Sequence, residues 1–147
     1  MKSILLIEDS PEDVFFMQRA LKKSGVTNPL QIAEDGQQAI AYLEGSGVYA
    51  DRTVYPLPAL VLLDLKLPFM RGLDVLKWIR EQRGLAKTVV IVFTSSALES
   101  DIGQAYEFGA NSYSIKPSSS DKLAEFTKAL QEYWLQHDYA CARYSGA

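Results

Sequence analysis

Short apolar runs alternate along this chain with longer stretches in which apolar residues recur every three or four positions. The short runs are typical of buried strands, and the longer periodic stretches are typical of amphipathic helices. The pattern predicts strands at residues 4–7, 30–34, 59–64, 89–93 and 111–115, and helices at residues 11–23, 39–43, 72–82, 98–108 and 119–135. Regular alternation of this kind requires a mostly parallel sheet with helices on both faces, joined by right-handed crossovers. We therefore expect a doubly wound α/β fold with a five-stranded parallel sheet and three layers, α/β/α.

The stretch from Leu57 to Gly72 contains the most informative of these strands. Its residues 59–63 include no polar side chain, which indicates a strand buried on both faces. The run ends at Asp64, and a charge directly after a buried strand is costly unless it has a partner or emerges at the edge of the sheet. Open parallel sheets bind their ligands at the carboxyl ends of the strands. Asp64 is therefore a candidate functional residue.

Length and composition fit one globular domain. The chain has 147 residues, of which 48% are hydrophobic, so we expect a single domain over residues 1–147, with its core at about 2–135 and a C-terminal tail at 136–147. The net charge of −3 gives no reason to expect a nucleic-acid partner. Met1 and Lys2 lead directly into a short apolar run that does not fit a signal peptide, and no run approaches the roughly 18 residues of a membrane span. A single cysteine fits a reducing compartment, so we expect a cytoplasmic protein without a membrane partner.

Polar side chains follow three further strands of the predicted sheet. Glu8 and Asp9 follow the first strand, Thr94 the fourth and Lys116 the fifth. Together with Asp64 they should converge on one edge, because all strands are parallel. Three neighbouring carboxylates repel one another unless a cation lies between them, and an all-oxygen ligand set with open positions suits Mg²⁺. A lysine and a hydroxyl at the same place could neutralise an anionic phosphoryl group. The pattern therefore favours transfer of a phosphoryl group to a carboxylate.

These residues resemble the markers of the receiver domains of two-component response regulators. The markers are Glu8-Asp9, Asp64 within the segment LLDLKLP, Thr94-Ser95, Tyr113 and Lys116-Pro117, in the order that the family has them and within residues 2–135. The resemblance implies a flavodoxin-like receiver fold. It also implies a signalling protein without an output domain, which catalyses only its own phosphorylation and dephosphorylation and is otherwise not an enzyme.

The resemblance further implies which residues hold the metal ion and the phosphoryl group. Asp64 would be the phosphoacceptor, taking the group from a phosphohistidine of a sensor histidine kinase. Mg²⁺ would be held by Asp9, by Asp64 and by the backbone carbonyl oxygen of Lys66, with Glu8 acting through water.

Five positions of this chain match residues that carry further roles in the family. Thr94 and Lys116 would contact phosphoryl oxygens. Tyr113 matches an aromatic switch residue that turns inward as the threonine follows the phosphate. Lys66 and Ser96 occupy the two positions that set the lifetime of the phosphoryl group, and the sequence does not give that lifetime.

A finer resemblance is to the stand-alone receivers that serve bacterial phytochromes. Shared features are the ILLIEDS opening, a long loop with tyrosines and prolines before the third strand, the TSS segment and a YW pair near the end of the last helix. This resemblance implies a phytochrome-type light sensor as the kinase and a homodimer as the assembly. The residues that could form the dimer surface are Phe126, Leu130, Tyr133 and Trp134, which fit an ordinary core equally well. The output surface expected for a downstream protein is the helix 98–108, strand 111–115 and helix 119–135.

Three other functions fit the residues less well. A haloacid-dehalogenase-type phosphatase needs a second acid two residues after Asp64, where this chain has Lys66. A Ser-His-Asp hydrolase is disfavoured because His137 is the sole histidine and lies in the tail, where we expect it and Cys141 to be inert. A nucleotide-binding domain needs a glycine-rich turn after the first strand, and residues 8–13 contain no glycine.

Overall fold

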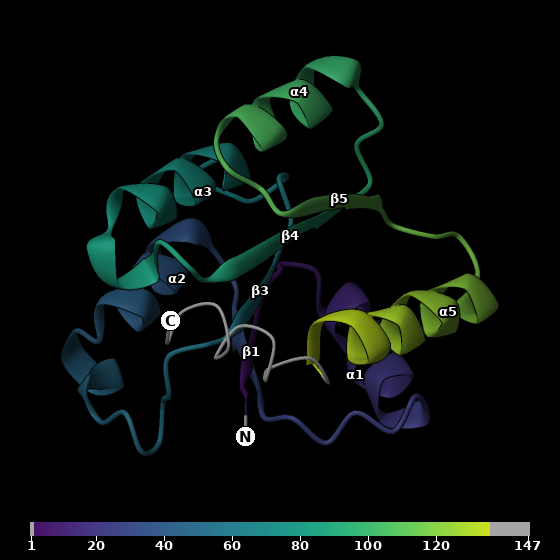
Figure 1. Cartoon of the computed structure of the whole chain (residues 1–147), viewed down its shortest axis with the longest axis horizontal. Coiled ribbons are helices and arrows are strands. Elements are labelled where there is room, and N and C mark those ends of the chain that lie inside the picture. Colours follow the sequence, from purple (N-terminus) through teal and green to yellow (C-terminus); the bar gives the residue numbers. More distant parts are fainter. Residues whose placement is uncertain (1, 136–147) are drawn as a thin grey trace, which may run out of the picture. The chain divides into compact units, whose positions relative to one another are not determined.

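The computed structural model describes residues 2–135, which contain one five-stranded parallel sheet and five α-helices. The strands are β1 (Ile4–Ile7), β2 (Leu30–Ala33), β3 (Leu60–Leu63), β4 (Val89–Thr94) and β5 (Ser112–Ile115), in the spatial order β2-β1-β3-β4-β5 (Figure 1). The helices are α1 (Pro11–Lys23), α2 (Gly36–Glu44), α3 (Gly72–Glu81), α4 (Glu99–Glu107) and α5 (Ser120–Leu130). This strand order is that of the flavodoxin-like doubly wound fold, so the predicted fold class is confirmed.

Most predicted elements agree with the observed ones to within a residue or two. The exceptions are α2, which begins at Gly36, and the end of the last helix, where a π-helical turn replaces the α-helix over Gln131–Leu135. A 3₁₀ turn, Gly47–Ala50, also lies inside the long loop between α2 and β3. Polar caps account for the starts of α2 and α5: Asp35 and Ser119 accept hydrogen bonds from the N–H groups of Gln38 and Lys122 at 2.7 and 3.2 Å.

The described chain forms two compact units. The first contains the residues up to Val14 and Asn28–Lys116, and so includes the whole sheet with α2, α3 and α4. The second contains Phe15–Thr27 and the chain from Pro117, and so includes most of α1 and all of α5. Within the second unit the hydroxyls of Ser24 and Thr127 are 2.6 Å apart, and Thr127 also donates to a carbonyl oxygen of α1. These polar contacts hold α1 and α5 together.

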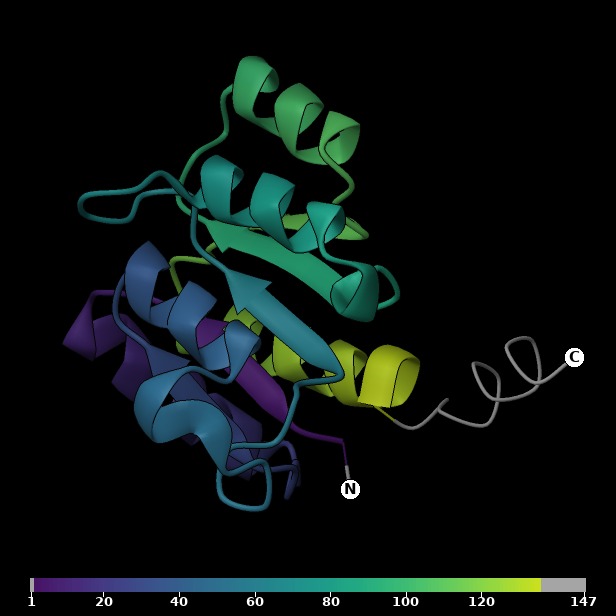
Figure 2. The same ribbon diagram turned by 90° about the vertical axis from the view of Figure 1, so that its left-hand side faces the viewer.

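In the first unit, the hydrophobic core lies between the sheet and the helices α2, α3 and α4. Strands β1 and β3 are buried at every position and lie next to each other at the centre of the sheet. Helices α2 and α3 lie side by side against this sheet (Figures 1 and 2). The apolar residues that α3 buries there are Leu73, Val75, Leu76 and Ile79. Because the central strands are packed on all sides, the residues that follow them are held in fixed positions.

Two arginines satisfy carbonyl oxygens that the loops of the first unit leave open. Arg52, in the loop before β3, donates to the carbonyl oxygens of Tyr42 and Leu43 at the end of α2, at 2.8 and 2.9 Å. Arg80, on α3, donates to the carbonyl oxygen of Gly109 at 2.9 Å and to that of Thr88 at 2.8 Å. Each guanidinium therefore ties a loop to a helix, because open helix-end and loop carbonyls need donors.

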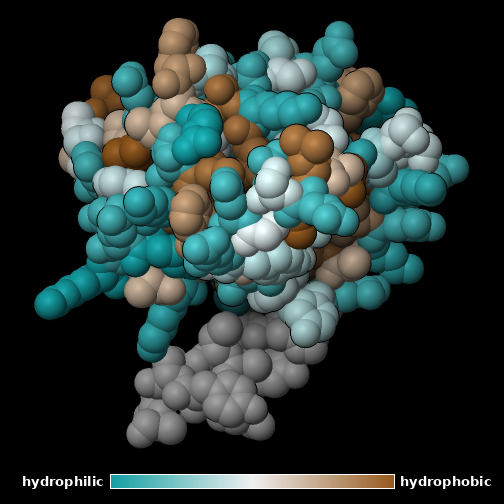
Figure 3. Space-filling model, turned by 90° about the horizontal axis from the view of Figure 1, so that it is seen from above, coloured by the Kyte–Doolittle hydropathy of each residue, from teal (hydrophilic) through white to brown (hydrophobic). Residues whose placement is uncertain are grey.

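On the face shown in Figure 3, hydrophilic side chains surround several smaller apolar areas. Large apolar side chains exposed in the first unit include Phe69 on the loop after β3, Leu98 before α4 and Tyr106 on α4. None of the helices within residues 2–135 combines the length and the apolar character that crossing a bilayer requires.

Gly72, the first residue of α3, lies directly against the backbone that follows β3. A Cβ added there would lie 2.2 Å from the carbonyl oxygen of Asp64 and 2.6 Å from the Cα of Leu65. The N–H of Gly72 also donates to the carbonyl oxygen of Leu65 at 3.0 Å. Only glycine permits an approach this close, so Gly72 lets the start of α3 fix the backbone of Asp64.

We predict that Gly72→Ala lowers the free energy of unfolding by about 2 kcal/mol, because a methyl group there must push backbone away from backbone. Urea unfolding measures the change. The matched control is Gly103→Ala in the exposed interior of α4, where an added Cβ meets nothing within 4 Å. This control should raise the free energy of unfolding by about 0.5–1 kcal/mol. Equal effects of the two substitutions would contradict the prediction.

Candidate functional site

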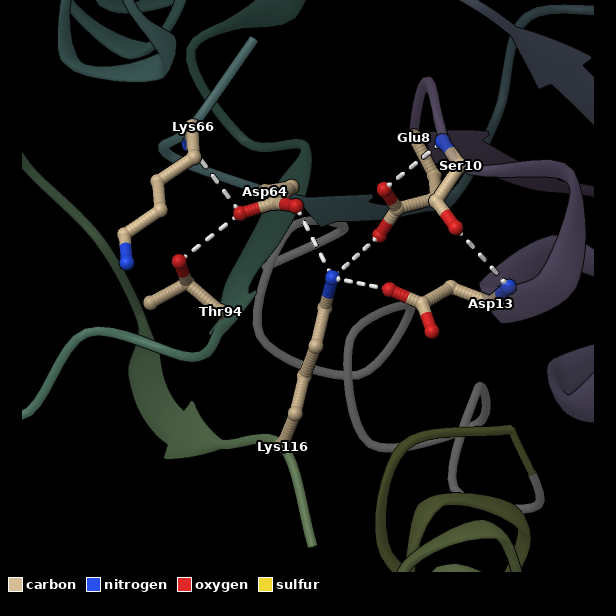
Figure 4. A network of polar contacts seen from close by, with 7 residues as sticks. All are labelled: Glu8, Ser10, Asp13, Asp64, Lys66, Thr94 and Lys116. Carbon is tan, nitrogen blue, oxygen red and sulfur yellow. Dashed lines mark hydrogen bonds and ion pairs between the residues drawn. The ribbon is translucent and has the colours of Figure 1, made fainter. Parts of the chain in front are cut away.

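The carboxyl ends of four parallel strands bring the predicted site residues together. Glu8 directly follows β1 and Asp64 directly follows β3, and the register of these strands pairs Ile7 with Leu63. Thr94 is the last residue of β4, and Lys116 directly follows β5. The first unit thus contributes every member of this group. The expectation that strand ends converge holds for all of these side chains (Figure 4).

Three carboxylates at this edge are close enough to share a metal ion. Glu8, Asp9 and Asp64 each offer one oxygen, and these oxygens lie within 4.8 Å of one another. Glu8 and Asp64 are buried, whereas Asp9 is exposed. Buried acids that are only partly compensated by hydrogen bonds are costly, and a divalent cation relieves that cost. The donor set is all oxygen and open to solvent on the side of Asp9, so it fits a hard ion such as Mg²⁺.

Both carboxylate oxygens of Asp64 accept hydrogen bonds. The hydroxyl of Thr94 donates to Oδ1 at 2.7 Å, and the backbone N–H of Lys66 donates to the same oxygen at 3.0 Å. The ammonium group of Lys116 lies 2.9 Å from Oδ2. These donors come from β4, from the loop after β3 and from the chain after β5, so they fix the orientation of the carboxylate (Figure 4).

Lys116 pairs with three carboxylates. Its Nζ lies 2.7 Å from Glu8 Oε1, 2.7 Å from Asp13 Oδ2 and 2.9 Å from Asp64 Oδ2. Burial alone would lower the pKa of Lys116, but the hydrogen bonds to these three acids outweigh it, and the pKa lies above its ordinary value. Lys116 therefore stays charged over the whole physiological range.

Glu8 is a buried acid whose charged form is disfavoured by its surroundings. Burial raises the pKa of Glu8 from 4.5 to about 7, and the charge of Asp64 adds to the rise. The hydrogen bond to Lys116 and that from the N–H of Ser10, at 3.2 Å, oppose the rise only in part. Near neutral pH Glu8 therefore gains from a cation more than an exposed glutamate would.

Asp13 belongs to this network although the sequence did not identify it as a site residue. It lies in the first turn of α1, where an acid is explained equally well by the helix dipole. The side chain of Ser10 accepts a hydrogen bond from the N–H of Asp13 at 3.3 Å, which caps α1 as its sequence predicts. A signal was present only in its position, since Asp13 lies in the first turn of the helix that begins just after the strand-end acids Glu8 and Asp9.

The two predicted lifetime positions differ in how they face Asp64. The backbone N–H of Lys66 contacts Asp64, but its exposed side chain extends past Thr94 and its ammonium points away from Asp64 (Figure 4). The hydroxyl of buried Ser96 lies 2.5 Å from Asp101 Oδ2 on α4. The hydroxyl of Tyr113 on β5 donates to the carbonyl oxygen of Ser96 at 2.9 Å. Tyr113 is half-buried, and its roles and those of the two lifetime positions stay predictions.

The residues expected to form a dimer surface belong to the second unit. Tyr133 is 68% exposed, whereas Leu130 is 2% exposed and has almost no side-chain area to offer a partner. Phe126 and Trp134 are partly exposed. The dimer surface stays a prediction, and Tyr133 is its most accessible member. The residues expected to be inert, His137 and Cys141, lie outside the described residues together with the predicted tail 136–147.

Comparisons with known proteins find relatives that cover most of this chain. The family model of the response regulator receiver domain matches residues 4–128. The response regulator Rcp1 of Synechocystis sp. is 36% identical over 135 residues, covering 92% of this chain and 90% of Rcp1. The crystal structure of the phosphorylated cyanobacterial phytochrome response regulator RcpA has a TM-score of 0.85 at 36% identity, over 92% of this chain and 94% of that one. The Mn²⁺-bound form of Rcp1 has a TM-score of 0.83 at 36% identity, over 93% and 96% of the two chains.

We predict that Glu8→Gln stabilises the protein in the absence of divalent ions, and increasingly so as the pH rises from 4.5 to about 7. The folded-state pKa of Glu8 is about 7 and its ordinary value is 4.5, so the stability that this group contributes is complete below 4.5 and is lost as the pH rises through 7. Glutamine has no such loss. We expect a gain of about 1–3 kcal/mol at pH 8.

Urea unfolding in the presence of a chelator, at a series of pH values, measures this gain. Glu12→Gln is the control, because Glu12 is an exposed acid in the first turn of α1. Stability curves of Glu8→Gln and wild type that run parallel with pH would refute the prediction.

Proposed function

The chain belongs to the response regulator receiver domain family, and on that premise we propose that Asp64 accepts a phosphoryl group from a phosphohistidine of a sensor histidine kinase. Receiver domains are signalling modules, so the result of the reaction is a changed surface rather than a released product. The observation that carries the proposal is the position of Asp64, whose two carboxylate oxygens meet Thr94 and Lys116 beside two further acids.

The proposed reaction is a single transfer. A carboxylate oxygen of Asp64 attacks phosphorus, a P–O bond forms, and the bond from phosphorus to the histidine nitrogen breaks. The electron pair of that bond leaves with the imidazole. Lys116 and Thr94 are placed to donate hydrogen bonds to the phosphoryl oxygens, whose charge must be stabilised throughout the transfer. Transfer would exchange their present bonds to Asp64 for bonds to the new group.

We propose that Glu8, Asp9, Asp64 and the backbone carbonyl oxygen of Lys66 hold Mg²⁺, which would neutralise charge on the phosphoryl oxygens. The three carboxylates are near enough for one ion, and the burial of Glu8 and Asp64 disfavours leaving these two acids without a cation. The Mn²⁺-bound form of Rcp1 supports a divalent ion in a similar receiver. The phosphorylated form of RcpA likewise supports a phosphorylated state for this chain.

We propose a phytochrome-type histidine kinase as the phosphodonor, because the similar proteins include a cyanobacterial phytochrome response regulator. The response would leave through α4, β5 and α5 to a separate downstream protein, with Thr94 and Tyr113 as the switch. The bond from Tyr113 to Ser96 supports this role, since it joins β5 to the loop that follows Thr94. Lys66 and Ser96 would set the phosphoryl lifetime.

The cellular setting and the assembly are part of the same proposal. We propose a single receiver domain with its core at residues 2–135, working as a homodimer in the cytoplasm without nucleic-acid or membrane partners. The family match over residues 4–128 supports the single domain. A haloacid-dehalogenase-type phosphatase is disfavoured, because the position of its general acid is held by Lys66, whose ammonium points away from Asp64 (Figure 4).

Incubation with acetyl phosphate and Mg²⁺ tests the phosphoacceptor. We expect the intact mass of the wild type to rise by one phosphoryl group, and we expect no rise for Asp64→Asn or after chelation of Mg²⁺. Lys116→Ala and Thr94→Ala should slow the reaction at least roughly tenfold, because each removes a donor to the transferred group. Asp74→Asn, an exposed acid on α3, is the control and should react like wild type. Rapid consumption of acetyl phosphate without a stable adduct would favour a phosphatase instead.

Light scattering with and without acetyl phosphate tests the assembly. We expect the mass of a homodimer and expect Tyr133→Glu to shift it toward the monomer, because a charge in an apolar interface is costly. Exposed Tyr106→Glu on α4 is the matched control. A monomer under all conditions would refute the homodimer without affecting the phosphoacceptor.

A further inference from the structure

A closed ring of polar contacts links Glu8, Ser10, Asp13 and Lys116. The N–H of Ser10 donates to Glu8 Oε2 at 3.2 Å, and the N–H of Asp13 donates to Ser10 Oγ at 3.3 Å. Lys116 closes the ring by pairing with Asp13 Oδ2 and Glu8 Oε1, each at 2.7 Å (Figure 4). Because Ser10 caps α1, the carboxylate of Asp13 extends from a fixed helical turn rather than from a mobile loop.

Asp13 differs from the other two partners of Lys116 in one respect. Glu8 and Asp64 belong to the group of acids whose oxygens could hold one metal ion, and Asp13 does not. An ammonium group has three N–H donors, and three carboxylates lie within 2.9 Å of this one. Two of these three would share their oxygens with a divalent ion, whereas Asp13 would bond the lysine alone.

A divalent ion at Glu8, Asp9 and Asp64 changes the balance of charge around Lys116. The ion competes with the lysine for oxygens of Glu8 and Asp64, and its two positive charges repel the ammonium. The bond to Asp13 persists, since Asp13 is not needed for the ion. It is then the contact that opposes displacement of Lys116 from the site.

We propose that Asp13 is a positioning residue, which keeps the ammonium of Lys116 beside Asp64 while a divalent ion occupies the neighbouring carboxylates. The inference rests on the proposed function, in which Lys116 meets an oxygen of the incoming phosphoryl group. Asp13 acts through Lys116 and touches neither the ion nor the phosphoryl group. Its carboxylate is 40% exposed, so it can hold the lysine at the open side of the site without adding a buried charge.

Two consequences distinguish this role from that of an ordinary acid at a helix start. First, Asp13→Asn weakens Mg²⁺ binding. Without its bond to Asp13, Lys116 shifts toward Glu8 and Asp64 and competes with the ion for their oxygens. Second, Asp13→Asn slows phosphorylation even at saturating Mg²⁺, because Lys116 is less often in place. We expect roughly a fivefold change in each, the size expected of a partly exposed ion pair. Asp13→Glu should restore most of both.

The experiment is a double-mutant cycle on the full chain. Calorimetric titration with Mg²⁺ gives the affinity, and the initial rate with acetyl phosphate at saturating Mg²⁺ gives the transfer step. The variants are Asp13→Asn alone and in a Lys116→Met background, with Lys116→Gln as a second background should the first be unstable. Loss of the Asp13→Asn effect on Mg²⁺ affinity in both Lys116 backgrounds is the expected result, because Asp13 acts through that lysine. If phosphorylation of the Lys116 variants is too slow to measure, the Mg²⁺ affinities alone complete the cycle.

Glu12→Gln is the matched control, because Glu12 is an acid in the same helical turn and so experiences the same helix dipole. It should change both readouts by less than about twofold, since exposed charges are screened by salt. An Asp13→Asn effect no larger than that of Glu12→Gln would overturn the positioning role. So would an equal effect with and without Lys116, which would mean that Asp13 attracts the ion directly. A wild type that binds no Mg²⁺ and gains no phosphoryl group would instead overturn the proposed function, and the inference with it.

Discussion

The ion pairs of Lys116 are the interaction on which the rest of the site depends. Glu8 and Asp64 lie at the ends of two adjacent buried strands, so folding brings two carboxylates together where water is scarce. Such a pair is unfavourable without a positive charge. Lys116, which directly follows the edge strand β5, supplies that charge. Its Nζ lies 2.7 Å from the carboxylate of Glu8 and 2.9 Å from that of Asp64. The repulsion between the two carboxylates makes the lysine necessary for the fold, and it also favours the binding of a divalent ion.

The sheet determines which groups can meet. The order β2-β1-β3-β4-β5 puts β3 between β1 and β4, so Asp64 has acids on one side and Thr94 on the other. Lys116 leaves the edge strand and crosses back with a long, flexible side chain. Gly72 then holds the backbone at Asp64 by letting α3 begin against it. A precise site therefore arises from packed central strands rather than from the loops alone, as is common in doubly wound folds.

The sequence was sufficient for the elements and for most of the site, because those depend on local pattern and on chain order. Buried runs such as 59–63 can hardly be anything but strands, and the residue that ends each run must lie at the same edge of a parallel sheet. Asp13 could not be found in this way, since an acid in a first helical turn has a sufficient local explanation. The hydrogen bond of Ser96 to Asp101 was also out of reach, because it depends on how the loop after β4 turns back onto α4. The sequence left open whether Leu130 is buried, because apolar helical spacing does not show which side of a helix is covered. The π-helical turn after α5 was not predicted, because the spacing does not show where the winding of a helix changes.

Ser96 makes two contacts at once, and this has a consequence for how a signal spreads. Its hydroxyl is bonded to α4 through Asp101, and its carbonyl oxygen is bonded to β5 through Tyr113. It lies only two residues after Thr94, so a displacement of that threonine pulls on both bonds through a short stretch of chain. Because both bonds meet at one residue, a displacement that strains one of them also strains the other. A single residue therefore couples helix α4 mechanically to strand β5.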